Sequence, residues 1–378
     1  MVLYRVEPKE ASKFLRELNV QEGGVSIMAK KMELLTFLIK GLKTPAANIL
    51  KQDALSIGAE LAVPSGVITC SQPYYDVLLI GTRREMEMLA KKEQAQPFGL
   101  KQVAQELTIM LKKTPKYPRR IMGVINANED SFFEGSRFLS DDAVVRIKQM
   151  IADGADIIDI GAVSSRPNAP MVDEAIEFER IQPICDAIAR EKLYTQTTFS
   201  IDSYTPKVVA YALKSGFSLV NDITGGANDE LIALALEHGA KFCIMHMQGS
   251  PQTMQKNPHY DDVMVEISHF FEERIAKCEA VGLRRENIIL DVGIGFGKSL
   301  EHNLTLIRNM AHFKKFGCEI LIGASRKSLI DMIIPTPVEE RLAGTLTLHL
   351  KAVEQGASIV RCHDVKEHRQ MLAILEKL

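Results

Sequence analysis

From residue 119 onward, short apolar segments alternate with longer amphipathic ones, and no break interrupts the series. The short segments are apolar at most positions, which is typical of strands that are covered on both faces. Eight of them are present: RRIMGVIN (119–126), DIIDIGA (156–162), FSIDS (199–203), SLVNDI (218–223), KFCIMHM (241–247), NIILDV (287–292), EILIGAS (319–325) and SIVRCH (358–363).

The segments between these strands have helical spacing. In DDAVVRIKQMIADG, the apolar residues at 143, 144, 147, 150 and 151 form one stripe, and Gly154 follows as a stop. In TPKVVAYALKSG, Thr205 suits an N-cap, Pro206 suits the first helical turn, and Gly216 ends the helix.

Eight strand-then-helix units in about 260 residues match the size of a closed (β/α)8 TIM barrel, which we assign to residues 116–378. An open, doubly wound α/β sheet is the structural alternative. The barrel predicts that catalytic groups lie at the C-terminal ends of the strands.

The first 115 residues show a different pattern, that of a small α/β module. The strand candidates are 2–6, 66–70 and 76–80, and the helix candidates are 11–18, 33–42, 46–61, 84–95 and 100–112. Pro115 and Pro118 mark the entry to the barrel. The module shows no phosphate loop, metal cluster or nucleophile motif, so we expect a scaffold or a subunit contact.

Composition adds mainly exclusions. The net charge of −2 gives no basic field that would recruit nucleic acid. The start MVLYRVEPKE is unlike a signal peptide, and no apolar run reaches the roughly 18 residues of a membrane span. The six cysteines show no CxxC spacing, which favours buried thiols over a disulfide or zinc framework. We expect a cytoplasmic protein without membrane or nucleic-acid partners.

Polar residues close most of the predicted barrel strands. They are Asn126, Asp159, Asp202, Asn221 with Asp222, Asp291, the run Ser325, Arg326 and Lys327, and Arg361 with His363. A single Asp after a strand is usually a helix N-cap. Seven strands that end this way instead favour one shared site. Buried carboxylates around one axis need partners, and a ligand rich in N–H donors beside a lysine would supply them.

Eight segments resemble, in order, the motifs of dihydropteroate synthases. MGVINANEDSFFEG (122–135) resembles the family signature MGILNVTPDSFSDGG, and GAVSSRPNAP (161–170) is similar to the GGESTRPGA loop. IDSY, NDITGG, MHMQG, DVGIGFGK, GASRKS and VRCHDV match further family segments along the chain. Single motifs are weakly specific, but eight in order on matching strands are very specific.

The resemblance implies a transferase of folate biosynthesis that joins 6-hydroxymethyl-7,8-dihydropterin diphosphate to p-aminobenzoate and expels pyrophosphate. It implies small-molecule substrates and Mg²⁺ as cofactor, held with the help of Asn126. By the same resemblance, the pterin is bound by Asp202, Asn221, Asp291 and Lys327, packed near Met245 and Phe296, and the diphosphate is bound by Arg361, His363 and Arg166.

The resemblance also implies the second substrate site and the reaction type. Phe132, Ser165, Pro167 and Ser325 would surround p-aminobenzoate. Asp202, Lys327 and Asp130 would be the catalytic residues of a dissociative substitution, in which pyrophosphate leaves before the amine attacks. We expect a homodimer, as many barrels pair through their outer helices.

The chain departs from the family pattern in the first two loops. Asn128 and Glu129 replace the usual Thr-Pro, so the loop loses a rigid residue, and sulfonamide sensitivity stays open although the family is a sulfonamide target. Two alternatives remain: a non-catalytic pterin-binding paralogue and a methyltetrahydrofolate methyltransferase. The second has no need for the SRK lysine, the Arg-x-His pair or the DSF loop.

Overall fold

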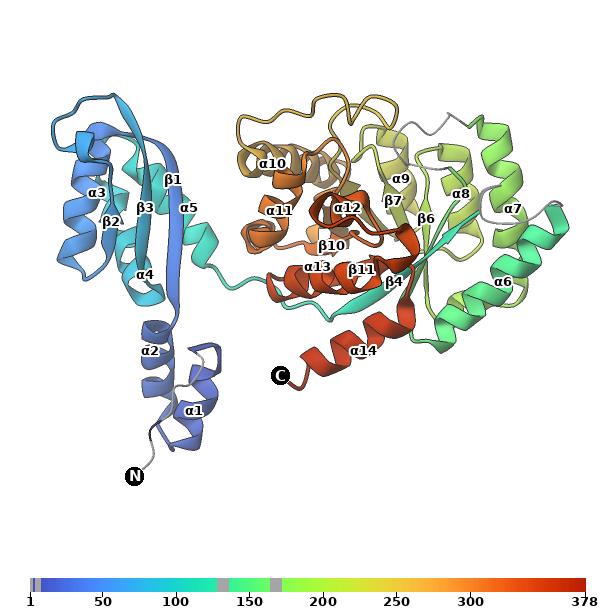
Figure 1. The fold of residues 1–378 in the computed structure, drawn as a ribbon, viewed down its shortest axis with the longest axis horizontal. Helices are drawn as coiled ribbons and strands as arrows, with labels where there is room; N and C mark the ends of the chain where they lie inside the picture. The colour runs from blue at the N-terminus through green and yellow to red at the C-terminus, as the bar shows by residue number, and fades with distance from the viewer. Residues whose placement is uncertain (1–2, 4–7, 128–135, 164–171) are drawn as a thin grey trace. The chain divides into compact units, whose positions relative to one another are not determined.

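The computed structural model describes residues 3, 8–127, 136–163 and 172–378. It divides into two compact units, Met1–Lys113 and Thr114–Leu378, which are described separately (Figure 1).

The N-terminal unit is built on a three-stranded antiparallel sheet in the order β1-β3-β2. The strands are β1 (Leu34–Lys43), β2 (Glu60–Ala62) and β3 (Tyr74–Thr82). The helices are α1 (Ala11–Glu17), α2 (Glu22–Met32), α3 (Thr44–Ser56), α4 (Arg83–Lys92) and α5 (Leu100–Leu111). The three strands and helices α3, α4 and α5 share one apolar core, which includes Leu50, Leu61, Leu79 and Leu89.

The structure corrects several expectations for this unit. The predicted helix 33–42 is strand β1, and the predicted strand 66–70 is a turn that begins with the 3₁₀ segment Ser65–Val67. Helix α2 was not predicted, and the helix expected over 46–61 ends at Ser56. The expected strand 76–80 lies inside β3, and the candidate at 2–6 falls largely outside the described residues.

The misread strand has a physical explanation. The run LLTFLI at the start of β1 is apolar at nearly every position, so helical and strand periods cannot be told apart there. Pairing with β3 makes this segment a strand. In the antiparallel register, Leu34 lies opposite Thr82 and Lys43 lies opposite Tyr74. A local pattern carries no information about that distant partner.

The C-terminal unit is a closed parallel barrel in the order β10-β11-β4-β5-β6-β7-β8-β9. Closure is made by β11 against β4, where Ile359 lies opposite Arg120 and Cys362 opposite Gly123. The predicted TIM barrel is therefore confirmed and the open sheet is excluded. The strands are β4 (Arg120–Asn126), β5 (Ile157–Gly161), β6 (Thr198–Asp202), β7 (Leu219–Asp222), β8 (Lys241–Met245), β9 (Ile288–Asp291), β10 (Glu319–Ile322) and β11 (Ile359–Cys362).

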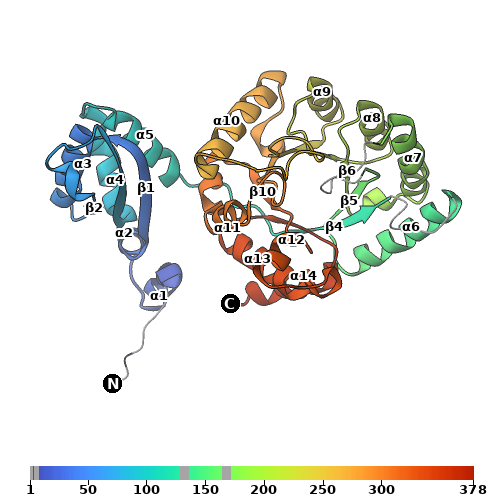
Figure 2. The same cartoon turned by 45° about the horizontal axis from the view of Figure 1, so that its top comes forward.

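Helices surround the barrel strands as an outer ring (Figure 2). They are α6 (Ser136–Ala152), α7 (Glu174–Arg190), α8 (Pro206–Lys214), α9 (Asp229–Glu237), α10 (Val263–Val281), α11 (Leu300–Arg308), α12 (Ser328–Ile333), α13 (Leu342–Glu354) and α14 (Val365–Leu375). The predicted stripe of α6 is confirmed, since Ala143 and Ile147 are fully buried. Thr205 does occupy the N-cap position of α8, but its hydroxyl donates to Glu177 instead of capping the helix.

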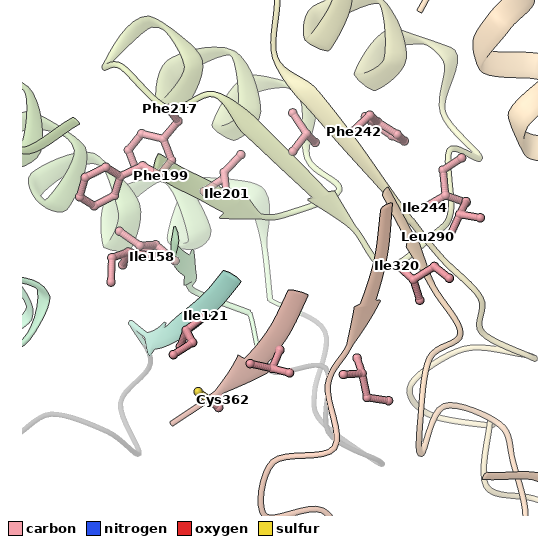
Figure 3. Packing of buried hydrophobic residues seen from close by; sticks show 14 of the residues in the cluster. Ile121, Ile158, Phe199, Ile201, Phe217, Phe242, Ile244, Leu290, Ile320 and Cys362 are labelled. Atoms are coloured by element: carbon pink, nitrogen blue, oxygen red, sulfur yellow. The ribbon is translucent and has the colours of Figure 1, made fainter. Parts of the chain in front are cut away.

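Alternate residues of each strand face the helices and the barrel interior. The outward set includes Ile121, Phe199 and Phe242, which belong to one core with the helices (Figure 3). A separate cluster holds one residue from each of seven strands and forms the interior apolar layer: Met122, Ile157, Leu219, Cys243, Ile289, Leu321 and Ile359. Below this layer, buried Glu319 accepts hydrogen bonds from Arg120 and Lys241. This polar group closes the barrel interior at the N-terminal ends of the strands.

Candidate active site

The polar site begins two residues beyond the interior apolar layer. Side chains two positions apart on a strand point to the same face, so the residues two positions after the apolar layer also face the barrel interior. On five of the strands these residues are Asp159, Asn221, Met245, Asp291 and Arg361. Asp202, at the end of β6, lies beside Asn221 in the strand register. The barrel therefore brings these side chains to its C-terminal end. Asp222, one position on, faces away and binds the hydroxyl of Thr224 and the backbone N–H groups of Thr224 and Gly226.

Arg361 is the centre of an ionic network that is largely buried, with side-chain exposure of 23% for Arg361, 15% for Asp202 and 0% for Asp159. Its Nε donates to Asp159 Oδ2 at 2.6 Å, and a terminal nitrogen donates to Asp202 Oδ2 at 2.7 Å. Asn221 Nδ2 also donates to Asp159 Oδ2, at 3.0 Å. Burial by itself lowers the pKa of Arg361, but the neighbouring carboxylates of Asp159 and Asp202 outweigh it and raise the pKa above its ordinary value.

The two acidic partners of Arg361 differ in their environment. Asp159 is fully buried, and its Oδ1 has no hydrogen-bond partner among the described residues. For Asp202, burial raises the pKa to about 7, against the opposing effect of Arg361. The carboxyl group of Asp202 therefore holds a proton more readily than an ordinary aspartate does.

Lys327 and Asp291 form the opposite side of the site. Lys327 Nζ donates to the carbonyl of Ile294 and lies 4.5 Å from the centroid of the Phe296 ring. Burial lowers the pKa of Lys327 to about 8, although Asp291 and Asp202 favour its charged form. Asp291 accepts a hydrogen bond from Gly293 N at 2.8 Å, and burial raises its pKa.

A second buried lysine, Lys298, was not assigned from the sequence. Its ammonium donates to His246 Nδ1 at 3.0 Å, to the His246 carbonyl at 3.2 Å and to the Phe296 carbonyl at 2.9 Å. These bonds tie the end of β8 to the loop after β9, which carries Phe296. The sequence offered one signal for this residue: Lys298 closes the apolar and glycine-rich run GIGFGK, and a lysine that is buried in such a run needs hydrogen-bond acceptors.

The backbone of this loop depends on a glycine. Gly293 has a φ of +66°, and a Cβ at this position would lie 2.0 Å from the carbonyl oxygen of His246. No side chain fits so close to backbone. Gly293 therefore fixes the path of the segment that bears Phe296 and Lys298.

The segment after β10 meets the end of β11. Ser325 Oγ and His363 Nδ1 are 2.9 Å apart, and the guanidinium of Arg326 makes two hydrogen bonds to Asp364, at 3.0 and 2.6 Å. Arg361 and His363 were expected to bind the same diphosphate. In the structure, the two side chains have different protein partners. Arg361 binds the buried carboxylates, whereas His363 binds Ser325.

The remaining predicted site residues are placed only in part. Asn126 ends β4 and lies opposite Gly161 in the register. Asp130, Phe132, Ser165, Arg166 and Pro167 lie outside the described residues. Within the described ranges, no group of three or more His, Cys, Asp or Glu side chains is arranged to hold a metal ion, and no helix is long and apolar enough to cross a membrane.

The fold and the site together define a class. A closed barrel whose C-terminal end gathers carboxylates, an amide and a lysine from its strands and the segments that follow them has the architecture of a barrel enzyme, whose active site lies at that end. The family model for pterin binding enzymes matches residues 122–363 of the chain, which is more than half of its length.

Two curated relatives make the assignment more specific. The bifunctional dihydropteroate synthase/dihydropteroate reductase of Helicobacter pylori is 39% identical over 378 residues and covers 100% of this chain and 99% of its own. The dihydropteroate synthase of Escherichia coli is 40% identical over 257 residues, covering 68% of this chain and 90% of its own. The chain therefore belongs to the dihydropteroate synthase family, whose members are transferases.

A solved structure agrees with both relatives. The crystal structure of Yersinia pestis dihydropteroate synthase in a sulfonamide drug complex has a TM-score of 0.65 and 35% identity to this chain. It covers 69% of this chain and 94% of its own.

Proposed function

We propose that the protein condenses 6-hydroxymethyl-7,8-dihydropterin diphosphate with p-aminobenzoate to give 7,8-dihydropteroate and pyrophosphate. The observation that carries the proposal is the convergence of Asp202, Asn221, Asp291 and Lys327 at one end of a closed barrel. Family membership supports the same reaction.

The four converging residues suit the edge of a pterin. The ring presents N–H and NH₂ donors beside a carbonyl and ring-nitrogen acceptors. Asp202, Asn221 and Asp291 would bind the donors, and Lys327 would bind the acceptors, because carboxylates only accept and lysine only donates. Phe296, held against Lys327, would cover the ring together with Met245.

The phosphate tail would be bound by Arg361 and His363, with Arg166 as a further ligand. Arginine's planar fork suits phosphate oxygens. In the structure the Arg361 guanidinium lies between Asp159 and Asp202, so it would bind phosphate while keeping a carboxylate partner. The same arginine then links the pterin acceptor Asp202 to the leaving group.

Mg²⁺ would be held by Asn126. The described residues contain no acidic or histidine cage for the ion. One neutral amide oxygen fits Mg²⁺ only if the ion keeps waters and takes its other ligands from phosphate oxygens. When bound, the ion would supply neutralisation of charge on the departing pyrophosphate.

Dissociative substitution follows from the distribution of charge. Departure of pyrophosphate leaves a cationic pterin methylene, whose charge spreads into the ring. The carboxylate of Asp202 would stabilise this charge, with Asp130 at the methylene side and Lys327 orienting the ring. The cysteines Cys185, Cys243, Cys278, Cys318 and Cys362 are buried, and we assign no covalent nucleophile.

The p-aminobenzoate site would be formed by Ser325 together with residues of the first two loops. Ser325 would contact the carboxylate of this substrate, and Phe132, Ser165 and Pro167 would line the remaining walls. Those three residues lie outside the described ranges, so their roles stay predictions.

The test of the function supplies pterin diphosphate, p-aminobenzoate and Mg²⁺ and follows pyrophosphate and labelled dihydropteroate. Formation of both in equal amounts supports the proposal. Pterin binding without pyrophosphate release would point to the non-catalytic paralogue. Methyl transfer from methyltetrahydrofolate to a corrinoid would point to the methyltransferase.

Pterin binding should have an optimum between about pH 7 and about pH 8. Below this range Asp202 takes up a proton and stops being an anionic acceptor. Above it Lys327 loses a proton and stops being a cationic donor. The measurement is the Kd of unphosphorylated 6-hydroxymethylpterin across pH, since this ligand avoids titration of the diphosphate.

Two variants test which residue causes the loss of affinity at low pH, the acidic limb of the curve, and which causes the loss at high pH, the alkaline limb. Asp202→Asn should remove the acidic limb and keep the alkaline one, and Lys327→Met should do the reverse. An affinity that stays constant through both pKa values would contradict the assigned roles.

Dihydropteroate reduction is a second candidate activity. The Helicobacter pylori relative with the bifunctional name aligns with the whole chain, including residues 1–113, whereas the Escherichia coli synthase covers only 68% of it. The full-length protein would be incubated with dihydropteroate and a reduced nicotinamide nucleotide as the electron donor. Two electrons and two protons added to the ring should give tetrahydropteroate. An unchanged level of dihydropteroate would remove this candidate.

We also propose a cytoplasmic homodimer. The cysteines among the described residues are all free thiols, which suits a reducing compartment. The apolar side chains of Met332, Ile333 and Ile334, at and just after the end of α12, are mostly exposed and adjacent, which suits a subunit contact. Sedimentation of the full chain would show a monomer if the homodimer is wrong.

A further inference from the structure

Two buried histidines lie behind the segment that carries Ser325 and Lys327. His349 belongs to α13 and His368 to α14, and neither exposes any surface. His349 Nδ1 and His368 Nε2 are 2.8 Å apart. Nothing in the proposed reaction uses either ring, so the pair calls for another explanation.

The outer partners of the two rings determine where the protons are. The backbone N–H of Ala324 donates to His349 Nε2 at 2.9 Å, so this nitrogen carries no proton. His349 Nδ1 must then carry it and donate to His368 Nε2. His368 in turn carries its proton on Nδ1 and donates to the Asp364 carbonyl at 2.6 Å. Both rings are neutral Nδ1–H tautomers in this arrangement.

Helix α13 holds the site segment at a second point. Thr345 lies one turn before His349, and its hydroxyl accepts the backbone N–H of Arg326 at 2.9 Å. One face of α13 therefore binds the N–H groups of Ala324 and Arg326, on either side of Ser325 and just before Lys327. Arg326 has a φ of +55°, a left-handed conformation that is unfavourable for a non-glycine residue and that these hydrogen bonds support.

The hydrogen bonds close into a ring around the ends of β10 and β11. Asp364 accepts from His368 through its carbonyl and from Arg326 through its carboxylate. Its neighbour His363 is bound to Ser325. Burial lowers the pKa of both His349 and His368, which agrees with neutral rings.

We propose that His349 and His368 are positioning residues, which as neutral Nδ1–H tautomers hold Ser325, Lys327 and His363 in the geometry that the reaction needs. The assignment of ligands to those three residues rests on the proposed function. The hydrogen-bond relay itself does not.

The first experiment compares variants of the full-length protein. His349→Leu leaves the Ala324 N–H and His368 Nε2 without partners, so kcat/KM for both substrates should fall on the order of tenfold to a hundredfold through misplacement of the segment. His349→Gln offers one acceptor and one donor and should recover most of the loss. The control is His312→Leu, which removes a half-buried histidine that is bonded to Ser268 and lies in the segment before the start of β10.

A merely structural role predicts a different result. His349→Leu and His312→Leu would then lower the thermal midpoint alike and leave kcat and KM of the folded enzyme unchanged. That outcome, or a glutamine variant as impaired as the leucine variant, would overturn the positioning role.

The second experiment needs no enzymatic activity. Nitrogen-15 NMR of histidine-labelled protein, assigned by comparison with His349→Gln and His368→Gln, should show both rings neutral and protonated at Nδ1. A proton on Nε2 of either ring would overturn the relay, even if the turnover assay succeeds. Failure of the turnover assay with correct tautomers would instead reject the proposed function and keep the relay.

Discussion

Replacement of Lys327 by methionine is expected to lower kcat/KM for the pterin diphosphate by about a thousandfold. The change removes the cation that faces the carbonyl and ring nitrogen of the pterin and keeps a side chain of similar length against Phe296. Loss of a preorganised donor costs on the order of 4 kcal/mol in the transition state, which corresponds to this factor. Steady-state kinetics with saturating p-aminobenzoate measure it.

The control for Lys327 is another lysine in the same kind of environment. Lys315 lies largely buried, 5.0 Å from the centroid of the Phe316 ring, in the segment that precedes β10 at the opposite end of the barrel. Lys315→Met should change stability slightly, because its ion-pair partner Glu272 is half exposed, and kcat/KM within a factor of about two, because Lys315 lies away from the site. If Lys327→Met were no worse than Lys315→Met, Lys327 would have no part in pterin binding.

Arg361→Met is expected to impair both stability and diphosphate affinity. Removal of the guanidinium leaves the buried carboxylates of Asp159 and Asp202 without their cation, which costs about 3–5 kcal/mol of folding free energy. Loss of the charge-assisted bonds to phosphate should weaken pterin diphosphate binding by a further factor of about ten to a hundred. Chemical denaturation and calorimetric titration measure the two effects separately.

A double variant separates the structural role of Arg361 from its binding role. Asp159→Asn combined with Arg361→Met removes one of the two unpaired charges and should restore part of the lost stability. Diphosphate affinity should stay low, because the phosphate ligand is still missing. Recovery of affinity along with stability would show that Arg361 acts only by holding its carboxylate partners.

The matched control for Arg361 is Arg120, which pairs with buried Glu319 at 2.5 Å at the N-terminal end of the barrel. Arg120→Met should lower stability in the same sense but by less, because Lys241 still donates to Glu319, and it should leave both ligand affinities unchanged. The structure also alters the sequence-based expectation for Arg361. Because this arginine binds Asp202, its loss should weaken unphosphorylated pterin as well, although less than the diphosphate.

The eight barrel strands could be predicted because each strand is covered on both faces and reads as a continuous apolar run. Their polar ends could be predicted for a related reason, since a charged residue that closes such a run stands out. The N-terminal unit was harder. In β1 the apolar residues fit both a helix and a strand, and only the pairing with β3 separates the two.

For the site as well, the sequence predicted one part, the candidate residues, and the tertiary structure was needed for the other, their contacts. Residue types at strand ends identified Asp202, Asn221, Asp291, Lys327 and Arg361 as candidates, because closure of a barrel brings all strand ends together whatever the details of packing. The sequence could not predict which of these side chains contact each other. The bonds of Arg361 to Asp159 and Asp202 join residues more than 150 positions apart in the chain.

By itself, therefore, the sequence predicted the eight strands, the helices between them and the end at which the polar residues gather, because these follow from local periodicity and chain connectivity. Pairing of β11 with β4 decided that the sheet closes into a barrel. The tertiary structure alone decided the partners of Arg361, the burial of Lys298 and the tautomers of His349 and His368. A hydrogen bond depends on the distance and direction between two groups, and in this protein those are set by elements that are remote in sequence.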